Sequence, residues 1–169
     1  MTTLPRAIAV LERDAWDPAH SAGAVTLDLD HRQRRRIRLS DDRGRAFLLD
    51  LPKAVTLRPG QGLALDSGDV LAVRAAPEPI ADLRCTDAVH LARLAWHLGN
   101  RHTPVQVVDA TTLRIRDDHT LTHMAEGLGA AVTRRTAPFE PEPGAYSAGH
   151  GHGHGHHYAL GQTGAHRHD

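Results

Sequence analysis

The sequence predicts an α+β protein with two folded domains and a disordered, histidine-rich C-terminal tail. Three observations lead to this prediction. Apolar residues alternate with polar ones over residues 1–76, a pattern typical of short, half-buried strands. Over residues 77–146 strand patterns alternate with helical ones, and over 147–169 histidine and glycine become the most frequent residues. We therefore expect a β-rich domain, a second α+β domain and a tail in these three ranges.

Composition limits the class of protein. The 169 residues include 20 basic and 20 acidic side chains, so no net charge attracts the chain to nucleic acid or to an anionic membrane. Its single cysteine, Cys85, cannot form an intramolecular disulfide, which fits a reducing compartment. The N-terminus has no basic start followed by an apolar run, and no stretch approaches the ~18 apolar residues of a membrane span. We expect a cytoplasmic protein that binds neither nucleic acid nor membranes.

The first domain is predicted to be a small all-β barrel or sandwich. Turn-forming residues separate its short strands, at 17–18, 41–44, 51–53, 58–60 and 66–68. Closely spaced strands with such breaks are typical of barrels and sandwiches, and we expect no catalytic role for this domain. The apolar side chains that alternate along the strands are Ile8, Val10, Val25, Leu27, Leu29, Ile37 and Leu39.

Residues 31–38 form the only basic cluster, and two interpretations of it compete. RNA binding would need aromatic side chains on which bases stack, and only Phe47 lies near in sequence. A charged strand at the edge of a sheet needs no such partner, because its charges serve to prevent pairing with another chain. We favour the edge strand.

The second domain is predicted to have a ferredoxin-like fold, with two helices on one face of a four-stranded antiparallel sheet. Pro77 and Pro79 restrict the backbone and predict a stiff hinge before it. Thr86 or Asp87 can cap the first helix and Asp118 the second. The predicted order is β-α-β-β-α-β, with a strand at 80–85, a helix to 98, strands at 105–108 and 113–115, a helix from 118 to a stop at Gly129, and a strand at 131–134.

The tail carries seven of the fourteen histidines and is predicted to bind divalent transition metal ions. Imidazole is a common ligand for these ions, and the alternating glycines leave neighbouring rings free to turn toward one ion. An expression tag would be an unbroken histidine run, whereas this segment continues into Tyr158, Ala159 and Leu160. The predicted tail ligands are His150, His152, His154, His156, His157, His166 and His168.

His102 is a further candidate ligand, because it follows the first helix of the second domain at a connection, where side chains are presented to solvent. A lone histidine in a loop is usually only a polar surface residue. One imidazole also cannot hold a metal ion tightly, so a functional His102 needs partners, such as its own copy in a second chain. His90 and His97 lie two helical turns, about 10 Å, apart and are expected to belong to a solvated helix face.

His119 and His123 are four residues apart at the start of the second helix, which puts both rings on one side, one turn apart. A metal-binding pair and a polar helix flank both remain open for them. The residue after His119 is threonine and not the glutamate that a zinc hydrolase uses as its base, which argues against a metal-dependent hydrolase. Cys85 is a weaker candidate ligand, since an isolated cysteine usually fills an apolar gap.

Several segments match one known family. The Gly-Asn-Arg-His turn that ends at His102, with the proline and glutamine after it, is specific in combination with a Phe-Glu-Pro-Glu segment and the histidine tail. Over nearly its whole length the chain resembles the UreE urease accessory proteins, a family of nickel chaperones. The matching segments are LAWHLGNRHTPVQV (94–107), DHTL (118–121), GLGA (127–130), PFEPEPGAY (138–146) and, in the first half, the basic strand, LDLP (49–52) and GDVLAVRA (68–75).

The resemblance implies a homodimer that carries Ni(II) as cargo and is not an enzyme. Its β-rich domain would bind partner proteins, and its ferredoxin-like domain would bind metal and form the dimer. His102 would be the nickel ligand at the dimer interface, one from each chain, with His119 as an auxiliary ligand and the tail as a source of further ligands. The nickel would pass to the urease accessory GTPase UreG, which loads apo-urease together with other accessory proteins.

The chain departs from the family pattern at three places. Asp117 and Asp118 stand where members often have a histidine just ahead of the position of His119, which implies a weaker or carboxylate-assisted auxiliary site. His123 is not expected from the family, so its role rests on helical spacing alone. The turn at 58–62 differs from the usual Gly-Asp turn, but it belongs to the first domain and not to the metal-binding region.

Two aspects of function stay open on the sequence alone. Imidazole chemistry does not select nickel, because copper binds more tightly in the usual divalent order and zinc is comparable, so Zn(II) or Cu(II) can compete. The alternative function is a histidine-rich nickel or zinc storage or buffering protein without a delivery role. Such a protein would bind many ions but would form no complex with a GTPase.

Overall fold

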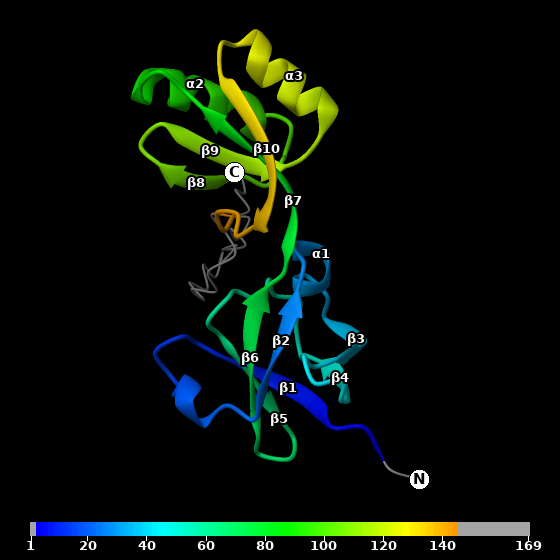
Figure 1. Cartoon of the computed structure of the whole chain (residues 1–169). Helices are drawn as coiled ribbons and strands as arrows, with labels where there is room; N and C mark the ends of the chain where they lie inside the picture. The colour runs from blue at the N-terminus through cyan, green and yellow to red at the C-terminus, as the bar shows by residue number, and fades with distance from the viewer. Residues whose placement is uncertain (1–2, 145–169) are drawn as a thin grey trace, which may run out of the picture.

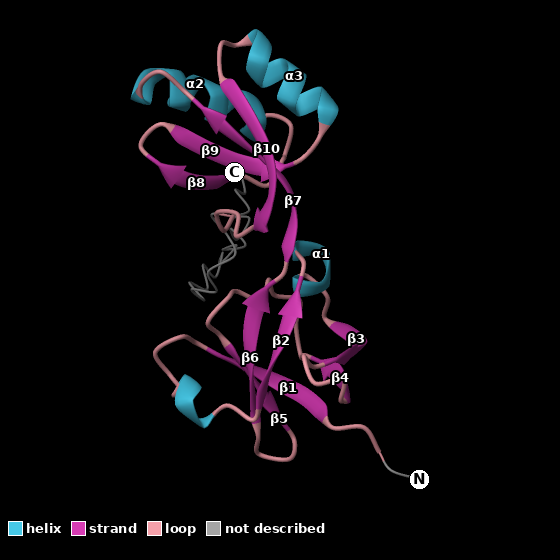
Figure 2. Cartoon of the chain, viewed as in Figure 1, coloured by secondary structure: helices cyan, strands magenta, loops and turns pink. Residues whose placement is uncertain are grey.

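A computed structural model of the chain describes residues 3–144. It contains a six-stranded sheet built from the first half of the chain and a four-stranded sheet with two helices built from the second half (Figures 1 and 2). This confirms the predicted α+β class and its two sheet-based parts. The predicted tail, with its seven candidate ligands, lies outside the described residues. No helix in the described part of the chain is long and apolar enough to cross a membrane.

The N-terminal sheet is a curled, mostly antiparallel sheet with the order β2-β6-β5-β1-β4-β3. Two pairings are parallel, β1 with β4 and β2 with β6. Its inner face buries one apolar cluster, which includes the fully buried Leu49, Leu57 and Leu63. Its elements are β1 (Arg6–Leu11), a 3-10 turn (Pro18–His20), β2 (Gly23–Leu27), α1 (Leu29–Arg32), β3 (Arg36–Ser40), β4 (Ala46–Asp50), β5 (Gly62–Leu65) and β6 (Val70–Ala75).

The alternation predicted for the first strand is interrupted. Ala7 is fully buried, whereas Ile8 is 43% exposed. The register between β1 and β5 shifts between Ala7 and Ala9, so one residue of β1 is extra and the side chains beyond it change face. Val10 packs partly against the core as a result. The prediction that Ile8 faces the core was therefore wrong.

The basic cluster divides between a helix and a strand. β3 lies at an edge of the sheet, so the charged edge strand that the sequence predicted is confirmed for Arg36 and Arg38. His31 and Arg32 instead end the short helix α1, which Asp28 caps by accepting the backbone N–H of His31 at 2.8 Å. Arg32 is completely buried, which the run of arginines did not predict.

The C-terminal sheet has the order β10-β7-β9-β8, with every neighbouring pair antiparallel. Helices α2 and α3 lie on the same face of it (Figure 1). This is the ferredoxin-like arrangement, and its core joins the sheet to the helices through Leu83, Leu94, Leu113 and Ala125. The elements are β7 (Pro77–Arg84), α2 (Ala88–Gly99), β8 (Gln106–Asp109), β9 (Thr112–Arg116), α3 (His119–Gly127) and β10 (Ala131–Pro138).

The predicted hinge at 77–79 is instead the beginning of β7. Pro77 pairs with Pro138 and Pro79 with Thr136 in the ladder to β10. On its other side, β7 pairs with β9 only from Ile80 onward. The proline nitrogens therefore fall where no neighbouring strand requires an N–H group, which is where a strand tolerates proline. The hinge prediction was wrong, because a proline whose nitrogen faces no neighbouring strand can lie within a strand.

A small apolar cluster joins the two sheets. It contains Leu29 from α1, Ile80 from β7 and Phe139, which follows β10, and all three are fully buried. Arg32 lies beside this cluster and donates to the backbone carbonyls of Leu27, at 3.2 Å, and Phe139. Burial lowers the pKa of the Arg32 guanidinium, and the charges of Glu78 and Glu140 partly oppose this effect.

Candidate metal centre

α2 positions the candidate ligand at its C-terminal end. Asp87 caps the start of the helix by accepting the backbone N–H of His90 at 2.9 Å, and this bond holds the pKa of Asp87 below its usual value. Leu94 and Leu98 are fully buried on the side that faces the sheet. The cap and the buried side fix the helix, so the turn that follows it has a defined place.

His102 occupies the residue of that turn that is usually glycine. Its backbone N–H donates to the carbonyl of Gly99 at 3.0 Å, and the N–H of Thr103 donates to the carbonyl of Leu98 at 3.4 Å. These two bonds, together with the φ of +53° at His102, define a Schellman motif. Arg101 adds a bond from Nη1 to the carbonyl of His97 at 3.0 Å. The backbone of the turn is thus satisfied without the His102 imidazole.

The His102 conformation carries a cost that glycine would avoid. Within residues 3–144, His102 is the only residue other than glycine with a positive φ. A side chain in this left-handed region costs about 1 kcal/mol or more, and such residues concentrate at functional sites. The imidazole is exposed at the end of α2. The structure therefore presents one histidine to solvent in a fixed turn, as the sequence predicted from its place in a connection.

His119 and His123 lie together at the start of α3. Asp118 caps this helix by accepting the N–H of Leu121 at 2.9 Å. The two rings have centroids 6.3 Å apart and an interplanar angle of 51°. The His123 side chain is 83% exposed and lies 4.0 Å from the carboxylate of Glu126. The rings can therefore turn toward a shared ion, but their metal role stays a prediction.

The described chain does not assemble these histidines into one site. Among residues 3–144, no three side chains of histidine, cysteine, aspartate or glutamate are grouped closely enough to hold an ion. His102 lies at the end of α2, and the His119 and His123 pair lies at the start of α3. The other predicted ligands, His150, His152, His154, His156, His157, His166 and His168, lie outside the described residues.

His90 is not the solvated residue that the sequence predicted. Its Nδ1 accepts the backbone N–H of Thr86 at 3.2 Å, and its Nε2 is buried with no partner among the described residues. The ring fills space beneath the end of α3, where a Cβ on Gly129 would lie 3.7 Å from its Cε1. The seven-residue spacing correctly predicts that His90 and His97 lie apart on α2. It does not show that the loop after α3 covers His90.

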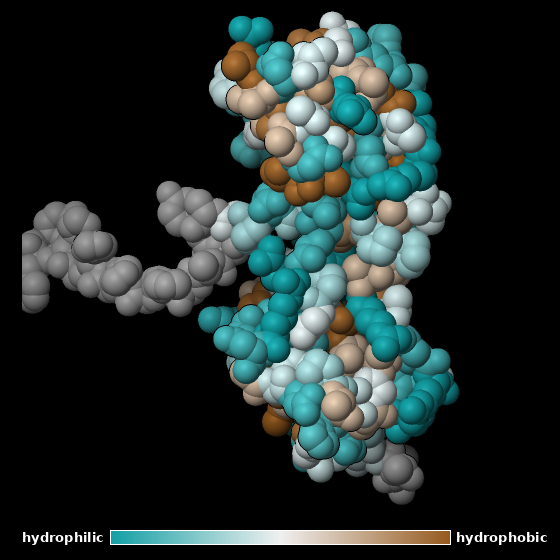
Figure 3. Space-filling model, turned by 60° about the vertical axis from the view of Figure 1, so that its left-hand side comes forward, coloured by the Kyte–Doolittle hydropathy of each residue, from teal (hydrophilic) through white to brown (hydrophobic). Residues whose placement is uncertain are grey.

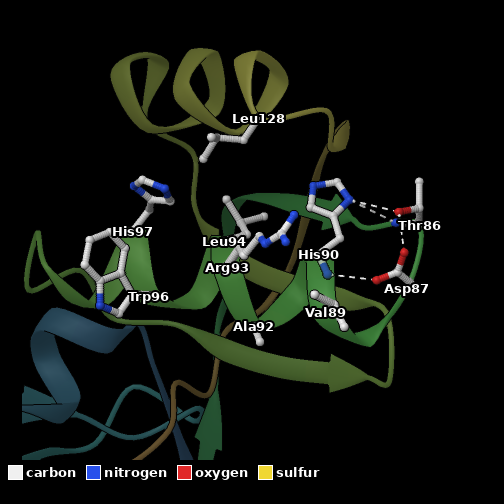
Figure 4. A pocket seen from close by; sticks show the side chains of 10 residues that line it. All are labelled: Thr86, Asp87, Val89, His90, Ala92, Arg93, Leu94, Trp96, His97 and Leu128. Carbon is white, nitrogen blue, oxygen red and sulfur yellow. Dashed lines mark hydrogen bonds between the residues drawn. The ribbon is translucent and has the colours of Figure 1, made fainter.

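An apolar surface on α2 was missed in the sequence. Val89 is 62% exposed and Trp96 is 64% exposed, and the Trp96 ring contacts the His97 ring edge-on at 5.0 Å between centroids. With Leu128 these side chains border a cavity of about 940 Å³ between α2 and the end of α3 (Figure 4). Figure 3 shows hydrophobic residues on the surface of this domain. The signal available was a tryptophan on the polar side of an amphipathic helix.

Cys85 lies inside the C-terminal domain. It is 4% exposed and packs in the same cluster as Leu83 and Leu94. Burial, followed by the nearby charge of Asp87, raises the pKa of its thiol. A raised pKa disfavours the thiolate form that binds metals, in agreement with the preference for an apolar packing role.

Comparison with known proteins decides the family. The model of the N-terminal domain of the UreE urease accessory protein matches residues 4–76, and the model of its C-terminal domain matches residues 78–169. The chain belongs to the UreE urease accessory protein family. The family resemblance inferred from the sequence is thereby confirmed, and membership gives the chain a role in urease maturation as an accessory protein.

Individual UreE relatives align with most of the chain. The urease accessory protein UreE of a Bradyrhizobium species is 50% identical over 142 residues, which cover 84% of this chain and 68% of the relative. The UreE proteins of Beijerinckia indica and Rhodobacter capsulatus are 48% and 45% identical, and the chain covers 81% and 91% of their lengths. Both domains therefore fall within the family.

Proposed function

We propose that this UreE family member is a nickel chaperone that delivers Ni(II) to the urease maturation complex. The observation that carries the proposal is His102, a histidine held exposed in a left-handed turn that glycine would fill at lower cost. In this proposal His102 is the transfer site. His119, His123 and the histidines of 150–169 act as auxiliary ligands that store and hand over the ion.

The donor set fits nickel as cargo. Exposed imidazoles suit nickel, copper and zinc, and individual imidazole bonds can exchange one at a time, as delivery requires. These donors do not by themselves select nickel, so Zn(II) and Cu(II) compete in the proposal. The choice of nickel comes from the family.

A second copy of the chain supplies the partner for His102. A tight metal site uses several ligands, and one imidazole is not enough. A two-fold axis near His102 would bring together the His102 imidazoles of two chains. The apolar surface of Val89 and Trp96 lies on the same helix that ends in the His102 turn. Exposed tryptophan is enriched where proteins associate, so this surface supports a homodimer formed through α2.

Glu142, which precedes the tail in the sequence, lies close to the proposed transfer site. The backbone N–H of Glu142 donates to the carbonyl of Val105, three residues after His102, at 2.7 Å. His150 follows Glu142 by eight residues, which span at most about 28 Å when extended. Tail histidines are therefore within covalent reach of His102 in the same chain, which supports their proposed role as additional ligands.

The remaining assignments follow from the family role. We assign residues 1–76 to partner binding, 77–146 to metal binding and dimerisation, and 147–169 to auxiliary metal binding. The proposed partners are the accessory GTPase UreG and the complex of apo-urease with its accessory proteins, and the proposed location is the cytoplasm. Nickel leaves by ligand exchange to the GTPase.

Cells that depend on this chain for urease activation test the proposal. Two variants are compared at ample nickel, the His102→Ala chain and a chain that ends at Tyr146. We expect urease activity to be lost in the first and nearly normal in the second, because the tail only adds capacity. Equal loss in both variants would contradict His102 as the transfer site. Calorimetry with Ni(II) should show fewer ions bound by the shortened chain.

A further inference from the structure

The segment of residues 139–142, here called the strap, follows β10 and contacts both domains. Phe139 is fully buried in the cluster between the sheets, and its carbonyl accepts from the buried Arg32. Glu140 accepts from Nη2 of Arg13 in the N-terminal domain at 2.6 Å, while its own N–H donates to Oε1 of Gln106 at 3.1 Å. The strap is therefore held at its first two residues by contacts with both halves of the chain.

Glu142 hydrogen-bonds to the edge of the C-terminal sheet, at residues that closely follow the His102 turn in the sequence. Its N–H donates to the carbonyl of Val105 at 2.7 Å, and its Oε1 accepts the N–H of Val107 at 3.2 Å. β8 is the edge strand of this sheet, so these two groups have no neighbouring strand to pair with on that side. Glu142 supplies both partners, one from its backbone and one from its side chain.

Two prolines restrict the backbone conformation of Glu142. Pro141 and Pro143 flank Glu142, and neither offers an N–H group. A residue that precedes proline is confined to extended conformations, which is the conformation that suits a contact along a strand edge. The sequence thus favours one extended geometry for Glu142, which suits its two bonds to the strand edge.

We propose that Glu142 is a positioning residue for the His102 site. Only Thr103 and Pro104 separate His102 from Val105, so a clamp on Val105 and Val107 fixes the exit of the His102 turn. The tail histidines follow Glu142 in the sequence, so a fixed Glu142 keeps the covalent tether between them and the His102 turn short, which raises the local concentration of their imidazoles. This inference rests on the proposed function of His102.

A purely structural role for Glu142 makes a different prediction. If Glu142 only covers an exposed sheet edge, its loss would lower the stability of the domain without a specific effect on the His102 site. A double-mutant cycle separates the two, because an interaction between two residues appears as non-additivity.

The experiment uses the full-length chain with the variants Glu142→Ala, Glu142→Gln, His102→Ala and the Glu142→Ala, His102→Ala double variant. Amide hydrogen exchange at Val107 should be faster in Glu142→Ala and normal in Glu142→Gln, since glutamine keeps the accepting oxygen. Calorimetry with Ni(II) should show the tightest binding step weakened about fivefold in Glu142→Ala and restored in Glu142→Gln. In the His102→Ala background, Glu142→Ala should have no further effect.

The outcomes separate this inference from the proposed function. If His102→Ala loses the tightest step while Glu142→Ala binds nickel like the wild type, the positioning role is refuted and the transfer site stands. A loss in Glu142→Ala that persists undiminished in the His102→Ala background also refutes it. If His102→Ala keeps the tightest step, the proposed function fails, and the inference fails with it.

Discussion

At the scale of the residue, the backbone and the side chain of His102 have separate roles. The backbone closes the turn after α2, and the imidazole is left free for another use. The Schellman turn needs a residue that tolerates a φ of +53°, and its two defining hydrogen bonds are donated by the backbone N–H groups of His102 and Thr103. The imidazole contributes nothing to this turn. A histidine there costs stability relative to glycine, and the metal role we propose accounts for its presence.

Substitution of His102 tests this separation. We expect His102→Gly to be more stable than His102→Ala by about 1 kcal/mol, because only glycine adopts the left-handed conformation without steric cost. Urea denaturation of both variants measures the difference. If alanine is as stable as glycine at this position, the turn does not hold the residue at positive φ in solution.

At the scale of the element, α2 has two different sides and ends in the His102 turn. Leu94 and Leu98 are fully buried against the sheet, whereas Val89 and Trp96 are more than 60% exposed on the outside. Apart from the edge contact between Trp96 and His97, these side chains lie largely open to solvent. Because the helix ends in the His102 turn, contact between two copies of α2 would bring two His102 side chains near the same axis.

Trp96→Glu tests the dimer surface. In the proposed dimer this charge would be buried in the interface between two copies of α2 and should convert the dimer to a monomer, as measured by light scattering after size-exclusion chromatography. Ile8→Glu is the matched control, since Ile8 is also exposed, at 43%, but lies in the N-terminal sheet and should leave the dimer intact. A dimer that persists in Trp96→Glu would place the interface elsewhere.

At the scale of the whole molecule, a buried cation joins the two domains. Arg32 from the N-terminal half donates to the carbonyl of Phe139 from the C-terminal half, beside the apolar contact of Leu29 with Ile80. Glu78 is also buried there and accepts the N–H of Leu29 at 2.9 Å. The junction thus combines apolar packing with a network in which each buried polar group has a partner.

Arg32→Ala should lower the free energy of unfolding by about 3 kcal/mol, because it leaves the buried Phe139 carbonyl unpaired and the charge of Glu78 uncompensated. The Leu27 carbonyl loses one bond but keeps the one from the N–H of Ala76. Arg36→Ala should change it by about 0.5 kcal/mol or less, since Arg36 is 67% exposed and pairs with Asp50 only at 3.7 Å. Chemical denaturation of the two variants checks this, and equal effects would contradict the role of Arg32 at the junction.

Local patterns predicted the elements well and their exceptions poorly. Capping residues and periodicity predicted the β-α-β-β-α-β order, because Asp87 and Asp118 act locally. The bulge after Ala7 depends on pairing with a distant strand, so periodicity could not show it. Burial of Arg32 likewise depends on Phe139, 107 residues away.

The candidate site, like the fold, was predictable from the sequence only where local patterns determine it. The sequence placed His102 in a connection, but its positive φ arises from the way in which the helix ends. The clamp of Glu142 on Val107 joins residues that lie 35 positions apart, and no local pattern indicates it. The apolar side of α2 could have been found, since Trp96 lies opposite the buried leucines on the helix.

Nickel titration of the full-length His102→Gly chain tests the central claim most directly. Glycine removes the imidazole and keeps the turn, so any change in binding reports the ligand and not the fold. We predict that calorimetry will show loss of the tightest nickel-binding step while the weaker steps of the other histidines remain. A His102→Gly chain that binds nickel as tightly as the wild type would contradict the assignment of His102 as the transfer site.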